Sequence, residues 1–143
     1  VTHEGFRLTR RSEALPSAES DVWLGDSMGE MVAYYSMVDV AVIGGSLLPF
    51  GGQNLIEAAA CGIPLIVGPH TYNFSAAALA AEQSGAATRV EAVTPETLAT
   101  AVNTLLSNQL LRHEAQVAAA QFVRAETGAT DKLLALIAQY HRP

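Results

Sequence analysis

Glu57 is the residue whose type and position could carry chemistry most directly in this sequence. It lies three residues after Asn54, where a glycine-rich loop gives way to a short apolar segment. A carboxylate at such a place could accept hydrogen bonds from the two hydroxyl groups of a ribose ring. The same spacing also predicts a capping box, with Asn54 as the N-cap of a helix and Glu57 at its third position. Both interpretations follow from the residues alone.

Three loops marked by glycine offer places where the backbone could approach an anion, and they span residues 25–30, 44–54 and 68–73. Each follows a predicted strand, and in a parallel sheet ligands bind beyond the carboxyl ends of the strands. Glycine permits close approach, and a following helix N-terminus supplies N–H groups. The loops contain neither G-x-G-x-x-G opening a helix nor G-x-x-x-x-G-K-[ST], which argues against NAD-type and P-loop sites.

Two further candidates carry the same ambiguity as Glu57. Ser27 and Glu30 fit a capping box on spacing alone, but Gly29 would weaken the helix they would begin, which favours a close approach to its backbone instead. His70 could donate to an anionic ligand or be an ordinary loop histidine. The basic residues at 7, 10 and 11 are typical of a solvated face, with a weaker case for a phosphate or an anionic lipid surface.

Strands and helices alternate along the first two thirds of the chain. We predict strands over residues 21–24, 39–43, 65–67 and 87–90, separated by helices over 27–35, 55–61 and 74–84. Helices beginning at Thr94-Pro95 and covering 108–126 and 129–140 complete the chain. This order is typical of an α/β protein with right-handed crossovers. We therefore expect one Rossmann-like domain over residues 1–143, with a mostly parallel sheet between two helical layers and a helical C-terminus.

The composition excludes several classes of protein. Half of the 143 residues are hydrophobic, and 14 acidic against 8 basic residues give a net charge of −6, which argues against nucleic-acid binding. We expect no signal peptide and no membrane-spanning helix, because the sequence shows no apolar run of the length that either of them needs. The single Cys61 suits a reducing compartment and excludes an internal disulfide, and the four scattered histidines argue against a metal site. We expect a soluble intracellular domain, and the opening Val1 suggests part of a longer protein.

Four segments together resemble the lipid A Kdo (3-deoxy-D-manno-octulosonic acid) transferases, a GT-B family of glycosyltransferases. The resemblance covers about residues 7–140, and its motifs occur in the order and at the spacing of the family; they are residues 25–30 (GDSMGE), 39–46 (DVAVIGGS), 51–57 (GGQNLIE) and 68–74 (GPHTYNF).

The resemblance implies a protein of two Rossmann-like domains. The N-terminal one binds lipid IVA at the cytoplasmic face of the bacterial inner membrane and supplies a catalytic glutamate, and the C-terminal one binds the donor CMP-Kdo or the product CMP. This chain is expected to be the C-terminal domain alone, with no catalytic residue of its own. The implied reaction is an inverting transfer that needs no metal and no cofactor.

The resemblance also implies roles for particular residues. Glu57 would bind the ribose and Asn54 would position it, while Gly44, Gly45 and Ser46 would lie near the phosphate or the sugar. The other expected nucleotide-sugar contacts are Ser27, Met28, Gly29, Glu30, Gln53 and His70. Gln53 stands where the family usually has histidine, so it can hydrogen-bond but carries no charge, and Ala58 stands where the family usually has proline.

Two alternatives remain open at this stage. The chain could be the donor domain of another GT-B transferase that uses a UDP-sugar. It could also be a Rossmann-like binding module without catalysis, in which the glycine loops are only tight turns and helix caps.

Overall fold

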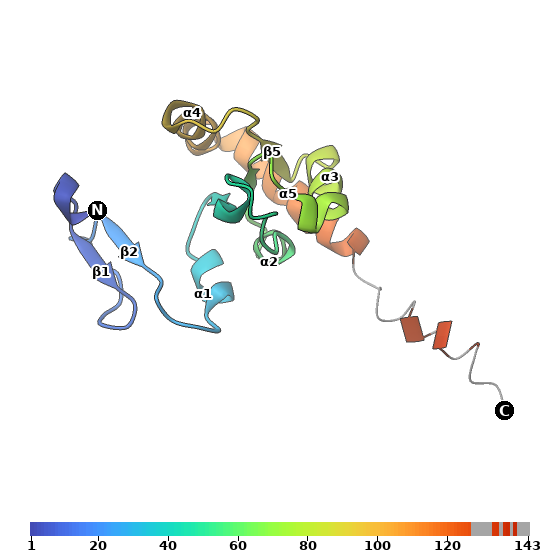
Figure 1. Ribbon diagram of the computed structural model, residues 1–143, viewed down its shortest axis with the longest axis horizontal. Coiled ribbons are helices and arrows are strands. Elements are labelled where there is room, and N and C mark those ends of the chain that lie inside the picture. Colours follow the sequence, from blue (N-terminus) through green and yellow to red (C-terminus); the bar gives the residue numbers. More distant parts are fainter. Residues whose placement is uncertain (127–132, 135, 138, 140–143) are drawn as a thin grey trace. The chain divides into compact units, whose positions relative to one another are not determined.

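The chain folds into two compact units, residues 1–34 and 35–143, in a computed structural model that describes residues 1–126, 133–134, 136–137 and 139. Each unit contains a parallel sheet of its own (Figure 1). The strands and helices are, in chain order, β1 (Leu8–Arg10), β2 (Val22–Leu24), α1 (Met31–Tyr35), β3 (Ala41–Val42), α2 (Ile56–Ala60), β4 (Leu65–Val67), α3 (Ser75–Gln83), β5 (Ala87–Arg89), α4 (Pro95–Ser107) and α5 (Gln109–Glu126). Short 3-10 turns cover Thr2–Glu4, Gly44–Ser46 and Tyr72–Phe74.

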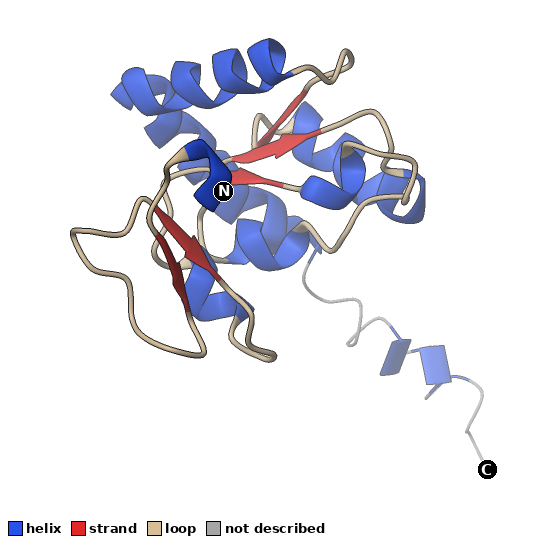
Figure 2. Ribbon diagram, turned by 60° about the vertical axis from the view of Figure 1, so that its left-hand side comes forward, coloured by secondary structure: helices blue, strands red, loops and turns tan. Residues whose placement is uncertain are grey.

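The larger unit is built on the sheet β3-β4-β5, in which β4 lies in the centre and all strands are parallel. Leu65 and Val67 belong to a buried cluster with residues of α2, α3 and α5, whereas Ile66 belongs to a second cluster with Leu98 and Leu105 of α4. Successive strand side chains point to opposite faces, so helices cover both faces of this sheet. Figure 2 shows these blue helices on either side of the red strands. The predicted three-layer order is confirmed for this unit.

Alanine allows the helices to pack closely against the sheet. Ala58, Ala59, Ala78 and Ala81 are all completely buried, and a side chain without γ-atoms lets two backbones approach each other.

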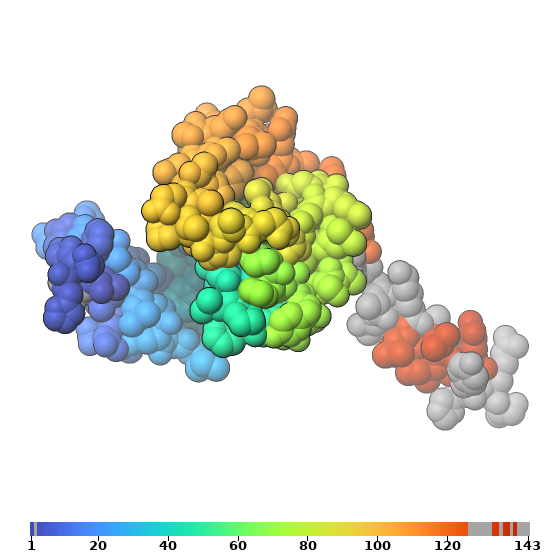
Figure 3. All heavy atoms as spheres, turned by 45° about the horizontal axis from the view of Figure 1, so that its top comes forward, coloured from blue at the N-terminus to red at the C-terminus, as the bar shows by residue number. Residues whose placement is uncertain are grey.

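In the space-filling view the segment from α3 to α4, yellow-green to orange, forms one continuous surface (Figure 3). The expected limits of α2, α3 and β5 are confirmed to within about a residue at each end.

Helix α4 begins as its sequence predicts. The Thr94 hydroxyl accepts from the backbone N–H of Thr97 at 3.2 Å, and Pro95 occupies the first turn. Asn108 caps α5 in the same manner, since its Oδ1 accepts from the N–H of Leu111 at 3.0 Å. The helix expected over residues 129–140 falls largely outside the described residues. Within the part of the chain that the structure describes, the helices are too short or too polar to cross a membrane.

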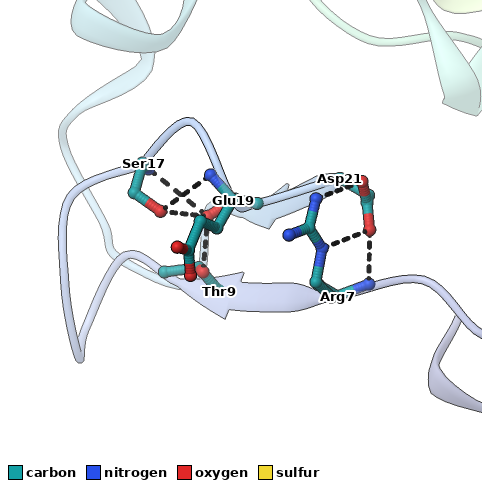
Figure 4. Close-up of polar contacts among 6 residues, drawn as sticks. Arg7, Thr9, Ser17, Glu19 and Asp21 are labelled. Carbon is teal, nitrogen blue, oxygen red and sulfur yellow. Dashed lines mark hydrogen bonds and ion pairs between the residues drawn. The ribbon is translucent and has the colours of Figure 1, made fainter.

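The smaller unit holds the parallel pair β1-β2, in which Leu8 lies opposite Val22. Figure 4 shows Arg7 facing Asp21 across the two strands, with Nε and Nη2 donating to the two carboxylate oxygens, each at 3.0 Å. The pairing corrects the prediction of a single sheet, because β2 pairs with β1 and not with the strands of the larger unit. Strand β1 was not predicted, because its three residues carry little apolar signal.

The three arginines of this unit are neutralised by carboxylates. Besides the pair of Arg7 with Asp21, Arg10 lies 3.6 Å from Asp26 and Arg11 lies 2.8 Å from Glu30. The hydrogen bonds that Arg7 donates lower the pKa of the Asp21 carboxyl from 3.8 to about 2. Because each guanidinium already has an anionic partner, these contacts weaken the case for a phosphate or lipid site at the arginines.

Helix α1 begins four residues later than predicted, at Met31 rather than at Ser27. Gly29 has a φ of +79°, a conformation outside the helical region that glycine adopts without strain. The Ser27 hydroxyl bonds to the side chains of Glu30 and Tyr34 rather than to a helix N–H group. Of the two interpretations of Ser27 and Glu30, the capping box is therefore excluded, and the four residues 27–30 form a loop ahead of the helix.

Candidate functional site

Asn54 and Glu57 are joined at the entrance to α2. The side-chain amide of Asn54 donates to Oε1 of Glu57 at 3.0 Å, and its Oδ1 accepts from the backbone N–H of Ile56 at 3.1 Å. The N-cap of α2 is Leu55, so the predicted cap at Asn54 is displaced by one residue and binds a different N–H group. Both side chains are exposed. The Glu57 carboxylate is thus held at a fixed place while it remains accessible to a ligand.

Ser46 joins two of the three glycine loops. Its hydroxyl donates to the carbonyl of Ile43 at 2.5 Å and accepts from the N–H of Gly68 at 2.8 Å, and its own carbonyl accepts from the N–H of His70 at 3.0 Å. The residue is completely buried. The Ser46 hydroxyl is therefore closed off from solvent and binds within the protein, and the expectation that Ser46 lies near the phosphate or the sugar stays a prediction.

Gly44 and Gly45 are glycines for different reasons. A Cβ atom on Gly45 would lie 2.9 Å from Cγ of Gln53, so the Gln53 side chain would have to shift to admit a larger residue there. At Gly44 a Cβ would meet nothing within 4 Å, and its φ is not positive. Gly44 is also exposed. Packing inside the protein therefore does not explain why residue 44 is a glycine. A ligand group that approaches the backbone from outside would explain it.

The loop over residues 44–54 is bonded along its length to the loop over residues 68–74. The Tyr72 hydroxyl donates to the carbonyl of Pro49 at 2.8 Å, and the Asn73 amide donates to that of Phe50 at 3.2 Å. The backbone N–H of Asn73 also donates to the carbonyl of Gly51 at 3.0 Å. These bonds join the loop that carries the predicted site positions 44, 45, 53 and 54, which leads into α2 and Glu57, to the loop that carries His70.

Arg89, at the end of β5, fixes the second of these loops and was not predicted. Its guanidinium donates to the carbonyl of Gly68 at 2.8 Å, to the hydroxyl of Thr71 at 3.2 Å and to the carboxylate of Glu82. Only a fifth of its side chain is exposed. Sequence reasoning could have used one signal, which is an arginine at the end of a predicted strand with Glu82 seven residues before it.

The remaining predicted residues lie in the smaller unit. Ser27 and Arg11 both donate to the Glu30 carboxylate, Arg11 at 2.8 Å, and Tyr34 lies 3.4 Å from the same group. These bonds, that of Ser27 foremost, lower the pKa of the Glu30 carboxyl. Met28 is almost fully exposed. The structure therefore groups residues 27–30 among themselves, and their share in a site with Glu57 stays a prediction.

A hollow of about 390 Å³ lies elsewhere in the larger unit, where β5 leads into α4. Its lining contains Arg89 but also the carboxylates of Glu91 and Glu96, and none of the predicted site residues. Two carboxylates disfavour an anionic ligand in this hollow. Among the described residues there is also no group of three histidine, cysteine, aspartate or glutamate side chains placed to hold a metal ion; the expected absence of a metal or cofactor stays a prediction.

Comparison with known proteins identifies the family. The model of the family described as glycosyl transferases group 1 matches residues 4–122. The chain belongs to this family. The match includes every predicted site residue, from Ser27 to His70, and therefore all three glycine loops.

Several relatives of this chain are Kdo transferases. The 3-deoxy-D-manno-octulosonic acid transferase of Bordetella pertussis is 45% identical over 132 residues, which cover 91% of this chain and 30% of that protein. The enzyme of Haemophilus influenzae is 36% identical over 138 residues, which cover 96% of this chain and 32% of that protein. The chain thus spans about a third of the length of these curated relatives.

A solved structure has the same fold as this chain. The crystal structure of the C-terminal CMP-Kdo binding domain of WaaA from Acinetobacter baumannii matches 85% of this chain and 63% of that chain, with a TM-score of 0.78 and 25% identity. The predicted fold class, a Rossmann-like α/β half of a GT-B enzyme, is confirmed, and so is the resemblance to the Kdo transferases.

Proposed function

We propose that this chain is the domain of a Kdo transferase that binds the nucleotide-sugar donor CMP-Kdo. The observation that carries the proposal is the placement of Glu57, an exposed carboxylate held by Asn54 beside two bonded glycine loops. The similarity to Kdo transferases and to a CMP-Kdo binding domain supports the identity of the ligand.

The proposed contacts follow from the chemistry of each group. The Glu57 carboxylate accepts hydrogen bonds from the ribose hydroxyls, and Asn54 fixes its orientation. The exposed backbone at Gly44 approaches the phosphate, where charge increases as the bond to the sugar breaks. Gln53 and His70, on the same pair of loops, provide hydrogen-bond donors near that phosphate. Residues 27–30 (Ser27, Met28, Gly29 and Glu30) remain predicted contacts of the nucleotide.

In the whole enzyme we propose an inverting, metal-independent transfer of Kdo to lipid IVA in lipopolysaccharide synthesis, at the cytoplasmic face of the inner membrane. A base outside this chain removes the proton of an acceptor hydroxyl, whose oxygen attacks the anomeric carbon while CMP leaves with the bonding electrons. This chain binds and orients the donor, and by itself it catalyses no transfer.

The test is calorimetric titration of the 143-residue chain with CMP, UMP and NAD. We expect weak binding of CMP, weaker binding of UMP and none of NAD, with CMP binding unchanged by EDTA. Equal affinity for CMP and UMP would favour a UDP-sugar domain instead. A chain that binds none of the three nucleotides would contradict the proposal and favour a module in which the loops are only turns.

A second assay tests the division of labour between the parts of the enzyme. The purified chain is incubated with CMP-Kdo and lipid IVA, and the lipid product is measured by mass spectrometry. We expect no Kdo-bearing lipid. A product in this assay would contradict the proposal that the base lies outside the chain.

A further inference from the structure

Three large apolar side chains are exposed on the two bonded loops of the larger unit. The exposed fractions are 56% for Leu48, 68% for Phe50 and 61% for Tyr72. Single exposed apolar side chains are common on protein surfaces. Two aromatic rings on adjoining loops beside a candidate site are less common, and clustered apolar exposure marks binding surfaces.

The ring of Tyr72 is held in place although most of it is exposed. Its hydroxyl donates to the carbonyl of Pro49 at 2.8 Å, and Asn73 next to it donates to the carbonyl of Phe50 at 3.2 Å. Gly51 has a φ of +89°, and a Cβ there would lie 2.5 Å from Cε2 of the tyrosine. The ring edge thus lies against a backbone without a side chain, and this arrangement fixes the ring before any ligand arrives.

The held ring adjoins the loop assigned to the phosphate. The ring packs on Gly51. The N–H of the next residue, Gly52, donates to the carbonyl of Gly45 at 3.0 Å. In a nucleotide-sugar the transferred sugar is bonded directly to the phosphate, whereas the base is separated from the phosphate by the ribose. A ring beside the phosphate loop is therefore placed for the sugar rather than for the base.

The chemistry of the two loops favours a small apolar surface as the partner of the exposed rings. Residues 44–54 and 68–74 contain no lysine, arginine, aspartate or glutamate. An anionic membrane surface is normally bound through basic residues, and a stable protein interface buries about 800 Å² per partner, more than three side chains provide. The face of a sugar ring that carries only C–H groups fits an aromatic ring of this kind.

We propose that Tyr72, with Phe50 on the adjoining loop, contacts the apolar face of the donor's sugar ring and thereby contributes to the choice of sugar. This inference rests on the proposed function and deepens it. It makes Tyr72 a specificity residue for the sugar, distinct from Glu57, which serves the nucleotide.

The test compares CMP with CMP-Kdo by calorimetric titration of the 143-residue chain and its variants. In the wild type we expect CMP-Kdo to bind more tightly than CMP. In Tyr72→Ala the affinity for CMP-Kdo should fall about 2- to 12-fold, as expected for one aromatic contact, while that for CMP stays unchanged. Phe50→Ala should act in the same direction with a smaller effect.

Two further variants separate the ring from the stability of the loop. Tyr72→Phe keeps the ring but loses the bond to Pro49, and it should preserve the preference for CMP-Kdo. Leu79→Ala removes a comparably exposed side chain on α3, 54% exposed, and should change neither affinity.

Each other outcome has a definite meaning. Equal losses of CMP and CMP-Kdo binding in Tyr72→Ala would overturn the inference in favour of a base contact or a damaged loop. Unchanged affinities in Tyr72→Ala would also overturn the inference. So would a wild type that binds CMP-Kdo no more tightly than CMP. In both cases binding of CMP would still support the proposed function. Failure of the wild type to bind either compound would overturn both.

Discussion

Asn54 bonds to both Glu57 and the backbone of α2, and its two side-chain atoms have separate tasks. Nδ2 donates to the Glu57 carboxylate at 3.0 Å, and Oδ1 accepts from the N–H of Ile56 at 3.1 Å. One residue thus fixes the first turn of the helix and the orientation of the carboxylate.

Substitution of Asn54 by aspartate should separate these tasks. Asn54→Asp keeps an acceptor for Ile56 but removes the donor and places a second negative charge beside Glu57. We expect the affinity for CMP to fall at least five-fold in calorimetry with a small change in stability. Asn54→Ala loses both bonds and should also cost about 0.5–2 kcal/mol of unfolding free energy. Unchanged CMP binding in Asn54→Asp would show that Glu57 needs no positioning.

Gly44→Ala tests whether a ligand approaches the backbone. Because a Cβ at Gly44 would meet nothing within 4 Å, the chain should fold with unchanged or slightly greater stability. The new methyl group should nevertheless lower the affinity for CMP about ten-fold if a phosphate lies there. Gly45→Ala is the contrasting variant, since Gln53 must move and the stability itself should fall. A Gly44→Ala chain that binds CMP as the wild type does would place the phosphate elsewhere.

Arg89→Lys should destabilise the larger unit. A lysine keeps the positive charge but cannot donate to Glu82, Gly68 and Thr71 together, so a partly buried group loses bonds at a cost of about 1–3 kcal/mol. Urea unfolding followed by circular dichroism measures the loss. The matched substitution Arg10→Lys, at an exposed pair 3.6 Å from Asp26, should have little effect. Equal losses in the two variants would contradict the role given to Arg89.

The smaller unit should lose stability in acid. The pKa of Asp21 is lowered from 3.8 to about 2 by hydrogen bonds from Arg7, and that of Glu30 is lowered by its bond from Ser27 foremost. A lowered pKa contributes stability that is present above the unfolded value and is lost as the pH falls through the folded one. The loss should therefore begin near pH 4.5 and continue towards pH 2.

Trp23 reports this transition selectively. It is the one tryptophan of the sequence and lies in the smaller unit, where its ring packs edge-on against Tyr34 at 5.3 Å. Its fluorescence, followed against pH at a fixed urea concentration, should show a smaller acid effect in Asp21→Asn than in the wild type. An identical pH profile in the variant would contradict the assignment to Asp21.

The sequence predicted the elements that depend on local pattern. The strand Leu65–Val67 was predicted because a strand buried on both faces is made of consecutive apolar residues. The start of α4 was predicted because threonine followed by proline is typical of a helix N-terminus. The candidate Glu57 was found for the same reason, since its spacing from Asn54 is local.

Features that depend on distant contacts were missed or misplaced. The start of α1 was wrong because Gly29 takes a positive φ and because Glu30 binds Arg11, 19 residues earlier in the chain. Arg89 was overlooked because one of its partners is the backbone carbonyl of Gly68, 21 residues away. Every residue has such a carbonyl, so residue type does not predict this contact. The burial of the Ser46 hydroxyl was not predicted, because its bond to the N–H of Gly68 joins residues 22 positions apart.

CMP titration of Glu57→Ala beside Glu96→Ala tests the central claim most directly. Both glutamates lie in the first turn of a helix, α2 and α4, so a purely structural role should make the two variants alike. We predict that Glu57→Ala abolishes measurable CMP binding with little loss of stability, and that Glu96→Ala binds CMP as the wild type does. CMP binding that survives in Glu57→Ala would contradict the assignment of Glu57 to the ribose.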